Sequence, residues 1–509
     1  MDRVVLPSML KSALLWGGKT VVLLCVFPLM SVLLQFLLSG LYNIYLHPLA
    51  KVPGPKLYAF TAVPHLYHMI KGDWHMILKK LHDQYGPVVR FCPISVSFIE
   101  SDAFQHIYGH KKAWEKPYEK DETFYVRPRL TENISFTSSV GHRRHRRLIS
   151  HAFSAKALSS QEHILKQYCD SFVSNLEKYS MQQGGSVDIV RWFNFVTFDL
   201  IGDLAFGESF GCMDQGGYHP WIHIMFSSIK FMIYHYVLCR LNLQRVVPLL
   251  LPASIKKGAE EHHKFARETS MRRMDAGIKD RPDFMSYILR YNDDRGLTPE
   301  EIFENANFLV VAGSETTASL LSGLVFYLLK HPDIYDKLVK EIRSAFNSQE
   351  EISLDGVSRL EYMLAVLKEG LRMCPPVPME LPRRVPEGGH NISSYWLPEN
   401  TRVGVSHFAA FMSSSNFRDP ETFTPERWLN DPRYADDKKD VHNPFSLGPR
   451  NCVGHNLAYA EMRLLLAYLL WNFDLESGSH DYEKWADQQV YATWQKQDLN
   501  VRLVRVARG

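Results

Sequence analysis

The sequence predicts a mostly helical domain with a minor β region, preceded by one transmembrane helix. Three observations lead to this prediction. No charged residue occurs between Thr20 and Leu46. Helical hydrophobic periodicity recurs over several long segments between residues 301 and 470. The segments with strand character are short and lie between turn residues. With 46% hydrophobic and 22% charged residues, the chain is neither disordered nor collagen-like.

The N-terminal segment is expected to be a membrane anchor. Its apolar run, VVLLCVFPLMSVLLQFLL, can cross a hydrocarbon core of about 30 Å as a helix. A cleaved secretory signal is the alternative, but the run exceeds a signal's apolar region and no small-x-small cleavage site follows. Pro48, Pro53 and Pro55 then end the helix. We therefore expect an anchor at 1–46, a proline-rich hinge at 47–56 and one domain at 57–509. Basic residues flank the run on both sides, so charge does not fix its orientation.

No repeat or Gly/Ser linker divides the remainder of the chain. The longest predicted helix, 301–329, follows Thr298-Pro299-Glu300-Glu301, which supplies an N-cap, a proline at the first helical position and a capping box. The segment 375–428 is rich in Pro, Gly and Asn and should be irregular with some sheet. The other predicted elements are helices at 333–348, 362–373 and 456–470 and strands at 88–91, 96–99 and 401–405.

Composition and two short motifs exclude several functions. The net charge of +3 does not favour nucleic-acid binding. Seven scattered cysteines without a C-x-x-C pair exclude a disulfide scaffold or zinc ribbon and suit a reducing compartment. The sequence Gly207-Glu208-Ser209-Phe210-Gly211 matches a hydrolase nucleophile elbow, but Asp199 and Asp203 before it have helical spacing, so a chance match is expected. His142-x-x-His145 and His262-His263 lack matching acids and are predicted to be surface histidines.

The strongest pattern surrounds Cys452. Residues 445–454 read FSLGPRNCVG, and a predicted helix follows at once, so its positive end should favour a thiolate. Gly448 permits a tight turn, Gly454 lets a flat ligand approach, Phe445 can pack beside the sulfur, and Arg450 supplies a cation. The arrangement suits a thiolate that ligates haem iron, with the guanidinium on a propionate. A buried, inert cysteine is the alternative, which the full spacing F-x-x-G-x-R-x-C-x-G disfavours.

This segment resembles the haem-binding signature of the cytochrome P450 superfamily at every fixed position. Three further matches follow the order expected along the chain: residues 312–317 (AGSETT), 369–372 (EGLR) and 423–428 (FTPERW). The resemblance is to membrane-anchored microsomal members, and in its details to filamentous-fungal enzymes of secondary metabolism. It implies the cytochrome P450 fold, haem b as the cofactor and Cys452 as the axial ligand of its iron.

The resemblance also assigns a role to an acid and an alcohol in the long helix. Glu315 and Thr316 are expected to deliver the protons that the splitting of dioxygen requires. Ala312-Gly313 would leave room for the oxygen molecule, where a bulge in the helix would add space. A polar pair at a helix–helix contact is the alternative for these two residues.

Two further groups of residues are assigned by resemblance. Glu369 and Arg372, at i and i+3, are expected to join Arg427 in a buried structural network. His142 and Arg146 share a helix face and, with Arg383, are expected to reach the haem propionates, although the family often has Trp at the position of His142. The neighbouring arginines, Arg143, Arg144 and Arg147, form either a solvated basic face or a docking patch for an acidic electron donor.

The implied function is a monooxygenase that inserts one atom of O2 into an apolar small molecule, such as a terpenoid, polyketide or alkaloid. The chain has no flavin or nicotinamide motif, so the electrons must come from an external donor. The resemblance implies that this donor is NADPH–cytochrome P450 reductase, which uses NADPH, with cytochrome b5 as a second donor. The resemblance places the domain on the cytosolic side of the endoplasmic reticulum membrane. Substrate residues are expected within 110–135, 208–250, 303–316, 377–381 and 491–494. A reductase-independent isomerase or dehydratase and a non-catalytic haem-binding protein are the alternatives.

Overall fold

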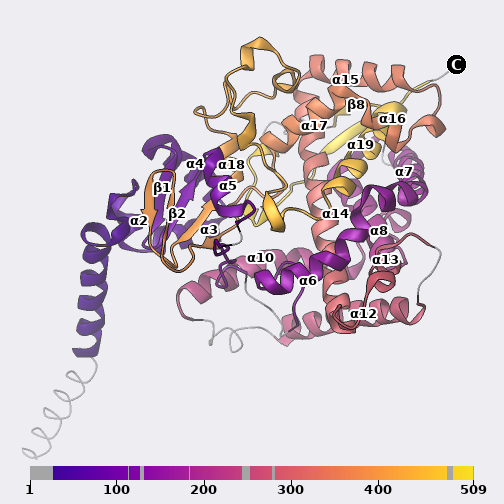
Figure 1. Ribbon diagram of the computed structural model, residues 1–509. Coiled ribbons are helices and arrows are strands. Elements are labelled where there is room, and N and C mark those ends of the chain that lie inside the picture. The colour runs from indigo at the N-terminus through magenta and orange to yellow at the C-terminus, as the bar shows by residue number, and fades with distance from the viewer. Residues whose placement is uncertain are drawn as a thin grey trace, which may run out of the picture.

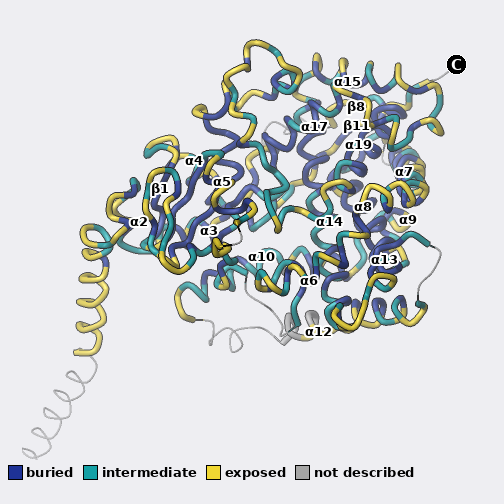
Figure 2. The backbone as a smooth tube through the Cα atoms, viewed as in Figure 1, coloured by how far each residue is buried: buried dark blue, intermediate teal, exposed yellow. Residues whose placement is uncertain are grey.

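The computed structural model describes residues 27–112, 114–125, 131–182, 184–243, 253–277, 281–478 and 485–507. Its N-terminal helix, Phe27–Tyr45, projects from the body of the molecule and is exposed along most of its length (Figures 1 and 2). Among the described residues, three helices are long and apolar enough to cross a membrane. The apolar stretch of this helix is only 6% buried, against 72% for Pro299–Lys330, so it is the candidate anchor. Residues 1–26 of the predicted anchor lie outside the described residues.

The base of this helix is attached to the body. Gly40 packs against the ring of Phe60 in α2 (Lys56–Phe60), where any added Cβ would collide with that ring. The Arg90 guanidinium donates a hydrogen bond of 2.8 Å to the carbonyl of Asn43. Leu49, within the 3-10 turn η1 (Pro48–Lys51), is completely buried. These contacts fix the direction in which the helix leaves the body.

Four strands form the sheet nearest to the N-terminal helix (Figure 1). Their order is β1 (Val88–Cys92), β2 (Ser95–Phe98), β7 (Arg402–Val405) and β4 (Arg383–Arg384). Only β2 and β7 run parallel, with Val96 opposite Val403. The three strands predicted from sequence are present within one or two residues of their expected bounds. The remaining strands are β3 (Ser186–Asp188), β8 (Phe473–Ser477) and β11 (Asn500–Arg505) in one sheet, and the hairpins β5–β6 (His390–Ile392, Tyr395–Leu397) and β9–β10 (Val490–Tyr491, Thr493–Trp494).

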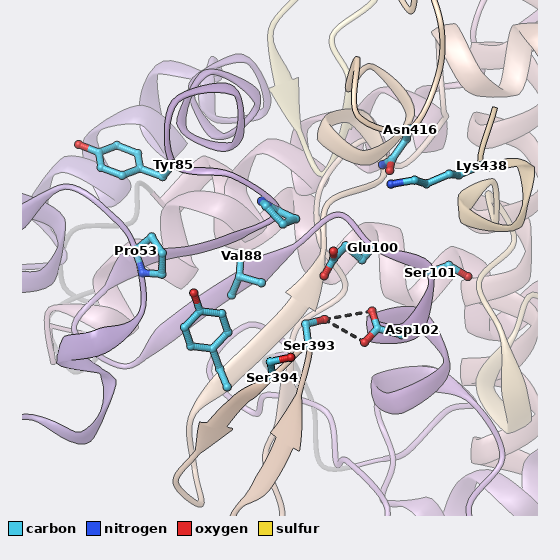
Figure 3. A pocket seen from close by; sticks show the side chains of 12 residues that line it. Pro53, Tyr85, Val88, Glu100, Ser101, Asp102, Ser393, Ser394, Asn416 and Lys438 are labelled. Carbon is cyan, nitrogen blue, oxygen red and sulfur yellow. Dashed lines mark hydrogen bonds between the residues drawn. The ribbon is translucent and has the colours of Figure 1, made fainter. Parts of the chain in front are cut away.

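The β5–β6 hairpin turns at two serines and is fastened to a helix. Ser393 and Ser394 have φ values of 45° and 67°, as a two-residue hairpin turn requires. The Ser393 hydroxyl donates to both carboxylate oxygens of Asp102 in α5 (Ser101–Tyr108), at 3.0 and 3.1 Å (Figure 3). Both residues line a surface hollow, and the hydrogen bonds between them hold the hairpin against α5.

The long helix α14 (Pro299–Lys330) passes through the middle of the body (Figure 1). Its N-terminus has the predicted capping box, since Thr298 and Glu301 each bond to the other's backbone amide. Helix α8 (Ile189–Phe206) packs along it and is buried except for Arg191. Three other predicted helices are confirmed as α15 (Pro332–Ala345), α17 (Glu361–Met373) and α19 (His455–Asn472).

The other described helices complete a body whose core lies around α8, α14, α17 and α19, which are largely buried (Figure 2). A smaller apolar cluster lies beneath the first sheet. The prediction of a mostly helical fold with a minor β region is confirmed. The helices not yet named are α3 (Val63–Lys71), α4 (Trp74–Tyr85), α6 (Ser139–Ile149), α7 (Ala155–Gln182), α9 (Cys212–Gln215), α10 (Pro220–Arg240), α12 (Ala253–Asp275), α13 (Phe284–Tyr291), α16 (Leu354–Ser358) and α18 (His407–Phe411).

The sequence that imitates a nucleophile elbow is the end of a helix. Gly207 adopts a left-handed φ of 78° and ends α8, so no strand leads into Ser209. The Asp199 carboxylate accepts hydrogen bonds from the amides of Cys212 and Met213, each at 2.9 Å, and holds the following turn. The geometry that a nucleophilic serine needs is therefore missing at this described segment.

Candidate active site

One cavity brings together most of the residues singled out in the sequence. It lies between α6, α14, the segment before β4 and the loop before α19, and the space between its atoms, including its opening, measures about 1500 Å³. Glu315, Gly448 and the network of Glu369, Arg372 and Arg427 do not line it. The predicted residues that do are His142, Arg146, Thr316, Arg383, Phe445, Arg450, Cys452 and Gly454.

The loop before α19 presents Cys452 to this cavity. The Cys452 amide donates a hydrogen bond of 2.9 Å to the carbonyl of Phe445, which closes the loop. Gly448 has a φ of +68°, and a Cβ there would lie 2.1 Å from the backbone oxygen of Tyr108. Glycine at position 448 therefore lets the loop pack closely against the backbone of Tyr108, although Gly448 does not line the cavity. At Gly454 an added Cβ would make only ordinary contacts, the nearest at 3.7 Å, so glycine is not required there by packing alone.

Opposing effects act on the pKa of the Cys452 thiol. Burial raises the pKa, whereas the amide of Gly454, at the start of α19, and the guanidinium of Arg146 lower it. The helix terminus therefore acts in the expected direction, but it does not outweigh burial. A metal ion on the sulfur would deprotonate it directly, so the site suits a thiolate whose charge is balanced by iron.

Six basic side chains line the same cavity. They are Lys120, His142, Arg146, Arg383, His407 and Arg450. The buried Nη1 of Arg450 has no hydrogen-bond partner among the described residues. Burial first, and then repulsion by neighbouring cations, lowers the pKa of Arg450 to about 10 and the pKa of Lys120 well below its usual value. A ligand with two carboxylates would relieve this repulsion, and the propionates of haem fit that requirement.

Lys120 was not identified from the sequence. Its ammonium donates 2.8 Å to the carbonyl of Ser135 and lies 4.2 Å from the centre of the Tyr125 ring. It lies in an irregular segment, where neither periodicity nor a motif indicates which way a side chain points. Among the described residues, no group of three or more His, Cys, Asp or Glu side chains could hold a metal ion directly.

The prediction that His142 and His145 lie at the surface is wrong. Their side chains are 4% and 0% exposed, because α6 packs against α14, where Nδ1 of His145 lies 2.9 Å from the amide nitrogen of Asn305. Burial, followed by repulsion from Arg450 and Lys120, lowers the pKa of His142 to about 3. His142 therefore faces the cavity as a neutral hydrogen-bonding group. The side chains of His262 and His263 lie outside the described part of the structure.

The neighbouring arginines of α6 are largely paired. Arg144 forms an ion pair with Glu301 and donates 2.7 Å to the carbonyl of Gly296. Arg147 donates to both oxygens of Asp293, at 3.1 and 3.0 Å. Arg143 is exposed. The basic face expected at residues 142–147 is therefore reduced, because two of its three outward arginines already have acidic partners.

The acid and the alcohol of α14 lie on different faces of the helix. The Thr316 hydroxyl lines the cavity and donates 2.7 Å to the carbonyl of Ala312, one turn earlier. Glu315 is buried outside the cavity lining, with one oxygen 2.6 Å from the ammonium of Lys496. Helix α14 is a continuous α-helix, so the bulge expected near Gly313 is absent.

An acid that was also missed from the sequence lines the cavity from α19. Burial raises the pKa of Glu461 in α19 to about 8, although a hydrogen bond with Thr317 of α14 partly opposes the shift. Its Oε1 is buried and has no partner among the described residues. Glu461 is the one acid in an otherwise apolar helix sequence, HNLAYAEMRLLLAYLLWN, which could have marked it.

The residues of the expected structural network are joined by hydrogen bonds. Arg372 donates to both oxygens of Glu369, at 2.9 and 2.8 Å, and Arg427 donates to the same carboxylate at 3.1 Å. All three side chains are completely buried. Burial alone would raise the pKa of Glu369, but Arg372 and then Arg427 hold it below its usual value. Arg427 also pairs with Asp437, so the network ties α17 to the loop that precedes Cys452.

Replacing Glu369 with Gln should destabilise the protein and release its cofactor. The substitution leaves two buried guanidinium groups short of negative charge, which typically costs about 3–5 kcal/mol. We expect less bound haem per chain and a lower urea midpoint. Haem content and urea unfolding of the purified protein measure both. Glu476→Gln, which breaks an exposed pair with Arg502, is the matched control and should change neither. Equal haem content in Glu369→Gln and the parent would contradict the expected role.

Replacing Glu461 with Gln should change how stability depends on pH. Because folding raises the pKa of this carboxyl from 4.5 to about 8, its protonated form stabilises the fold, and that contribution is lost as pH rises toward 8. The parent should therefore lose roughly 1–3 °C more than Glu461→Gln in its thermal midpoint between pH 6 and pH 9. Parallel midpoint curves for the two proteins would show that Glu461 is not held in its protonated form.

Known proteins resemble this chain along nearly its whole length. The sequence model described as Cytochrome P450 matches residues 52–499. Cytochrome P450 monooxygenase aclL of Aspergillus oryzae is 44% identical, over 91% of this chain and 94% of its own length. Cytochrome P450 monooxygenase astA of Talaromyces wortmannii is 41% identical, over 91% and 93%. Averantin hydroxylase of Dothistroma septosporum is 39% identical, over 93% and 90%.

The family binds haem, and its monooxygenases require O2 and a redox partner. The predicted resemblance to fungal monooxygenases of secondary metabolism and the prediction of an oxidoreductase are confirmed. A cavity with a free cysteine, a surplus of cations and a helix threonine is what such a cofactor needs. The chain belongs to the cytochrome P450 family.

Proposed function

We propose that this protein is a membrane-anchored haem-thiolate monooxygenase that hydroxylates an apolar small molecule in a secondary-metabolite pathway. The observation that carries the proposal is the joint presence of Cys452, the surplus of cations and Thr316 in one cavity. When bound, haem b supplies the activation of dioxygen, helped by electron donation from the thiolate. One relative is named averantin hydroxylase, which favours hydroxylation as the reaction.

In this proposal Cys452 ligates the iron and the basic residues hold the propionates. Arg450 contributes its unpartnered Nη1, Arg146 and Arg383 contribute charge, and His142 contributes a neutral hydrogen bond. Arg146 is itself held by Asn451, to whose backbone and side-chain oxygens it donates at 2.5 and 2.8 Å. That contact links the propionate side of the site to the residue before Cys452.

Thr316 and Glu315 supply protons in this proposal. Thr316 offers a hydroxyl at the cavity wall, already oriented by its bond to Ala312. Glu315 is one residue away, but it must turn around α14 to exchange a proton with the cavity. The apolar surroundings keep bulk water out, so protons must come through such side chains.

The lining of the cavity supports an apolar substrate. Its apolar members include Ile201, Phe284, Phe308, Leu309 and Leu381. Three of the five predicted substrate ranges contribute, namely 110–135, 303–316 and 377–381. The described residues of 208–250 and 491–494 do not line it. We infer that terpenoids, polyketides and alkaloids of mostly hydrocarbon surface are the class to screen.

NADPH–cytochrome P450 reductase is the proposed electron donor, with cytochrome b5 as a second. The exposed helix Phe27–Tyr45 supports attachment to a membrane, for which we propose the endoplasmic reticulum with the body in the cytosol. Residues 1–46 would form the anchor, 47–56 the connection and 57–509 the catalytic domain. The exposed Arg143 on α6 is a candidate contact for the acidic donor.

The function is tested with the full chain, reductase, NADPH and a panel of such compounds. The parent should bind haem, give a thiolate-type spectrum with carbon monoxide, and add one oxygen atom to at least one compound only when NADPH is present. Cys452→Ala should lose that spectrum and the product. Conversion of a peroxide without NADPH would instead indicate an isomerase or dehydratase. Haem binding with neither reaction would indicate a carrier, and a thiolate-type spectrum in Cys452→Ala would refute the ligand assignment.

The proposed topology is tested at a natural glycosylation sequence. Asn391, in Asn391-Ile-Ser393, is exposed, whereas Asn133, in Asn133-Ile-Ser135, is buried. A cytosolic body leaves Asn391 without a glycan, so endoglycosidase treatment should not change the protein's mobility. Replacing the N-terminal segment with a cleaved secretory signal should add a glycan at Asn391. A glycan on the unaltered protein would place the body in the lumen.

A further inference from the structure

Lys496 forms a buried ion pair with the acid of the acid–alcohol pair. Its Nζ lies 2.6 Å from Oε1 of Glu315 and 3.0 Å from the hydroxyl of Ser319, which itself lies 3.3 Å from Oε1. The side chains of Lys496 and Glu315 are only 6% and 5% exposed. Ser319 follows Glu315 by one helical turn, so all three groups meet on the face of α14 next to the one that lines the cavity.

The segment that carries Lys496 is fastened on both sides. Before it, the indole of Trp494 donates 2.7 Å to the carbonyl of Pro375. After it, the amide of Leu499 donates 3.0 Å to the carboxylate of Asp188. These contacts fix the backbone of Lys496 beside α14, and the Glu315 carboxylate and the Ser319 hydroxyl hold its ammonium.

The surroundings of Glu315 offer little to replace this cation. Its Oε2 is buried without a hydrogen-bond partner among the described residues. The titratable groups that act on the pair from neighbouring elements are the phenol of Tyr218, which feels the charge of Glu315, and the thiol of Cys374, which feels that of Lys496. Both are neutral at physiological pH, so Lys496 is the charge that balances the carboxylate.

We propose that Lys496 is a positioning residue. It holds the Glu315 carboxylate beside the cavity and determines how readily Glu315 releases a proton. This inference rests on the proposed function, in which Glu315 delivers protons. When Glu315 gives up a proton it becomes a carboxylate, and Lys496 stabilises that product. Without the ammonium, the buried carboxyl keeps its proton and becomes a weaker acid.

The first test reads the protonation of Glu315 directly and needs neither substrate nor turnover. Infrared spectra of the full haem-loaded chain at pH 7 report a protonated carboxyl by its carbonyl band. Lys496→Met should gain such a band, and the double variant Lys496→Met/Glu315→Gln should lose it again. The parent and Lys496→Arg, which keeps the positive charge, should show only the band of carboxyls such as Glu461 that stay protonated in every variant, so the reading is the difference from the parent spectrum. Absence of the band in Lys496→Met would overturn the inference.

The second test uses dioxygen itself as the probe, with reductase and NADPH but no organic substrate. Reduction to hydrogen peroxide consumes one NADPH and one proton per O2, and reduction to water consumes two NADPH and two protons. Slower proton delivery should favour peroxide. Lys496→Met should therefore form water about tenfold more slowly than the parent. This loss is smaller than the rate enhancement of about 10²–10⁴-fold that a positioned general acid contributes, because Glu315 itself is still present. Lys496→Arg should restore most of the rate.

Controls separate this inference from loss of structure and from the proposed function. Arg502→Met removes an exposed cation from the same C-terminal region and should leave the rate of water formation unchanged. If Lys496→Met does not fold, the double variant Lys496→Met/Glu315→Gln, which removes both buried charges, replaces it. Its rate of water formation is then compared with that of Glu315→Gln. If Glu315→Gln forms water slowly but Lys496→Met forms it at the normal rate, the inference about Lys496 is overturned and the proposed role of Glu315 stands. A normal rate in Glu315→Gln, with a thiolate-type carbon monoxide spectrum, would overturn both it and the proposed role of Glu315.

Discussion

The excess of positive charge in one buried cavity is the constraint on which the rest of the site depends. Arg450 has an unpartnered donor, and burial, followed by repulsion from neighbouring cations, lowers the pKa of Lys120 and His142. Such a cluster in a largely apolar cavity is costly unless a ligand supplies negative charge. The thiol of Cys452 poses the complementary problem, since its anion is costly until a metal cation binds. Haem resolves both at once, because it carries carboxylates at its edge and iron at its centre.

Elsewhere the fold balances buried charge by its own means. Glu369 lies between Arg372 and Arg427, and Asp437 balances the second arginine. That network needs no ligand, and it lies where α17 meets the chain leading to Cys452. The contrast separates structural from functional charge: a buried ion with all its partners maintains the fold, whereas a buried ion that lacks a partner marks a place where something binds.

The sequence predicts what is local and misses what depends on distant segments. The capping box of α14, the bounds of α17 and α19, and the loop from Phe445 to Gly454 follow from neighbouring residues, and the structure contains them. The burial of His142 and His145 depends on α14, more than 150 residues away, so a run of basic residues looked like a surface. Lys120 lies in an irregular segment without a pattern. Glu461 is the one acid of its helix, but its burial against Thr317 depends on how α19 packs on α14.

The positions of the acid and the alcohol of α14 suggest how water can be excluded while protons still enter. Thr316 has its hydroxyl in the cavity but cannot ionise near neutral pH, so it can pass a proton but not store one. Glu315 can accept and release a proton, but it is paired with Lys496 on the adjacent face of α14. Because Glu315 and Thr316 lie on different faces of α14, the ionised carboxylate stays outside the cavity for an apolar substrate, where its charge would be costly. The backbone on both sides of Lys496 is hydrogen-bonded to other elements, so the fold places the base of this side chain beside Glu315.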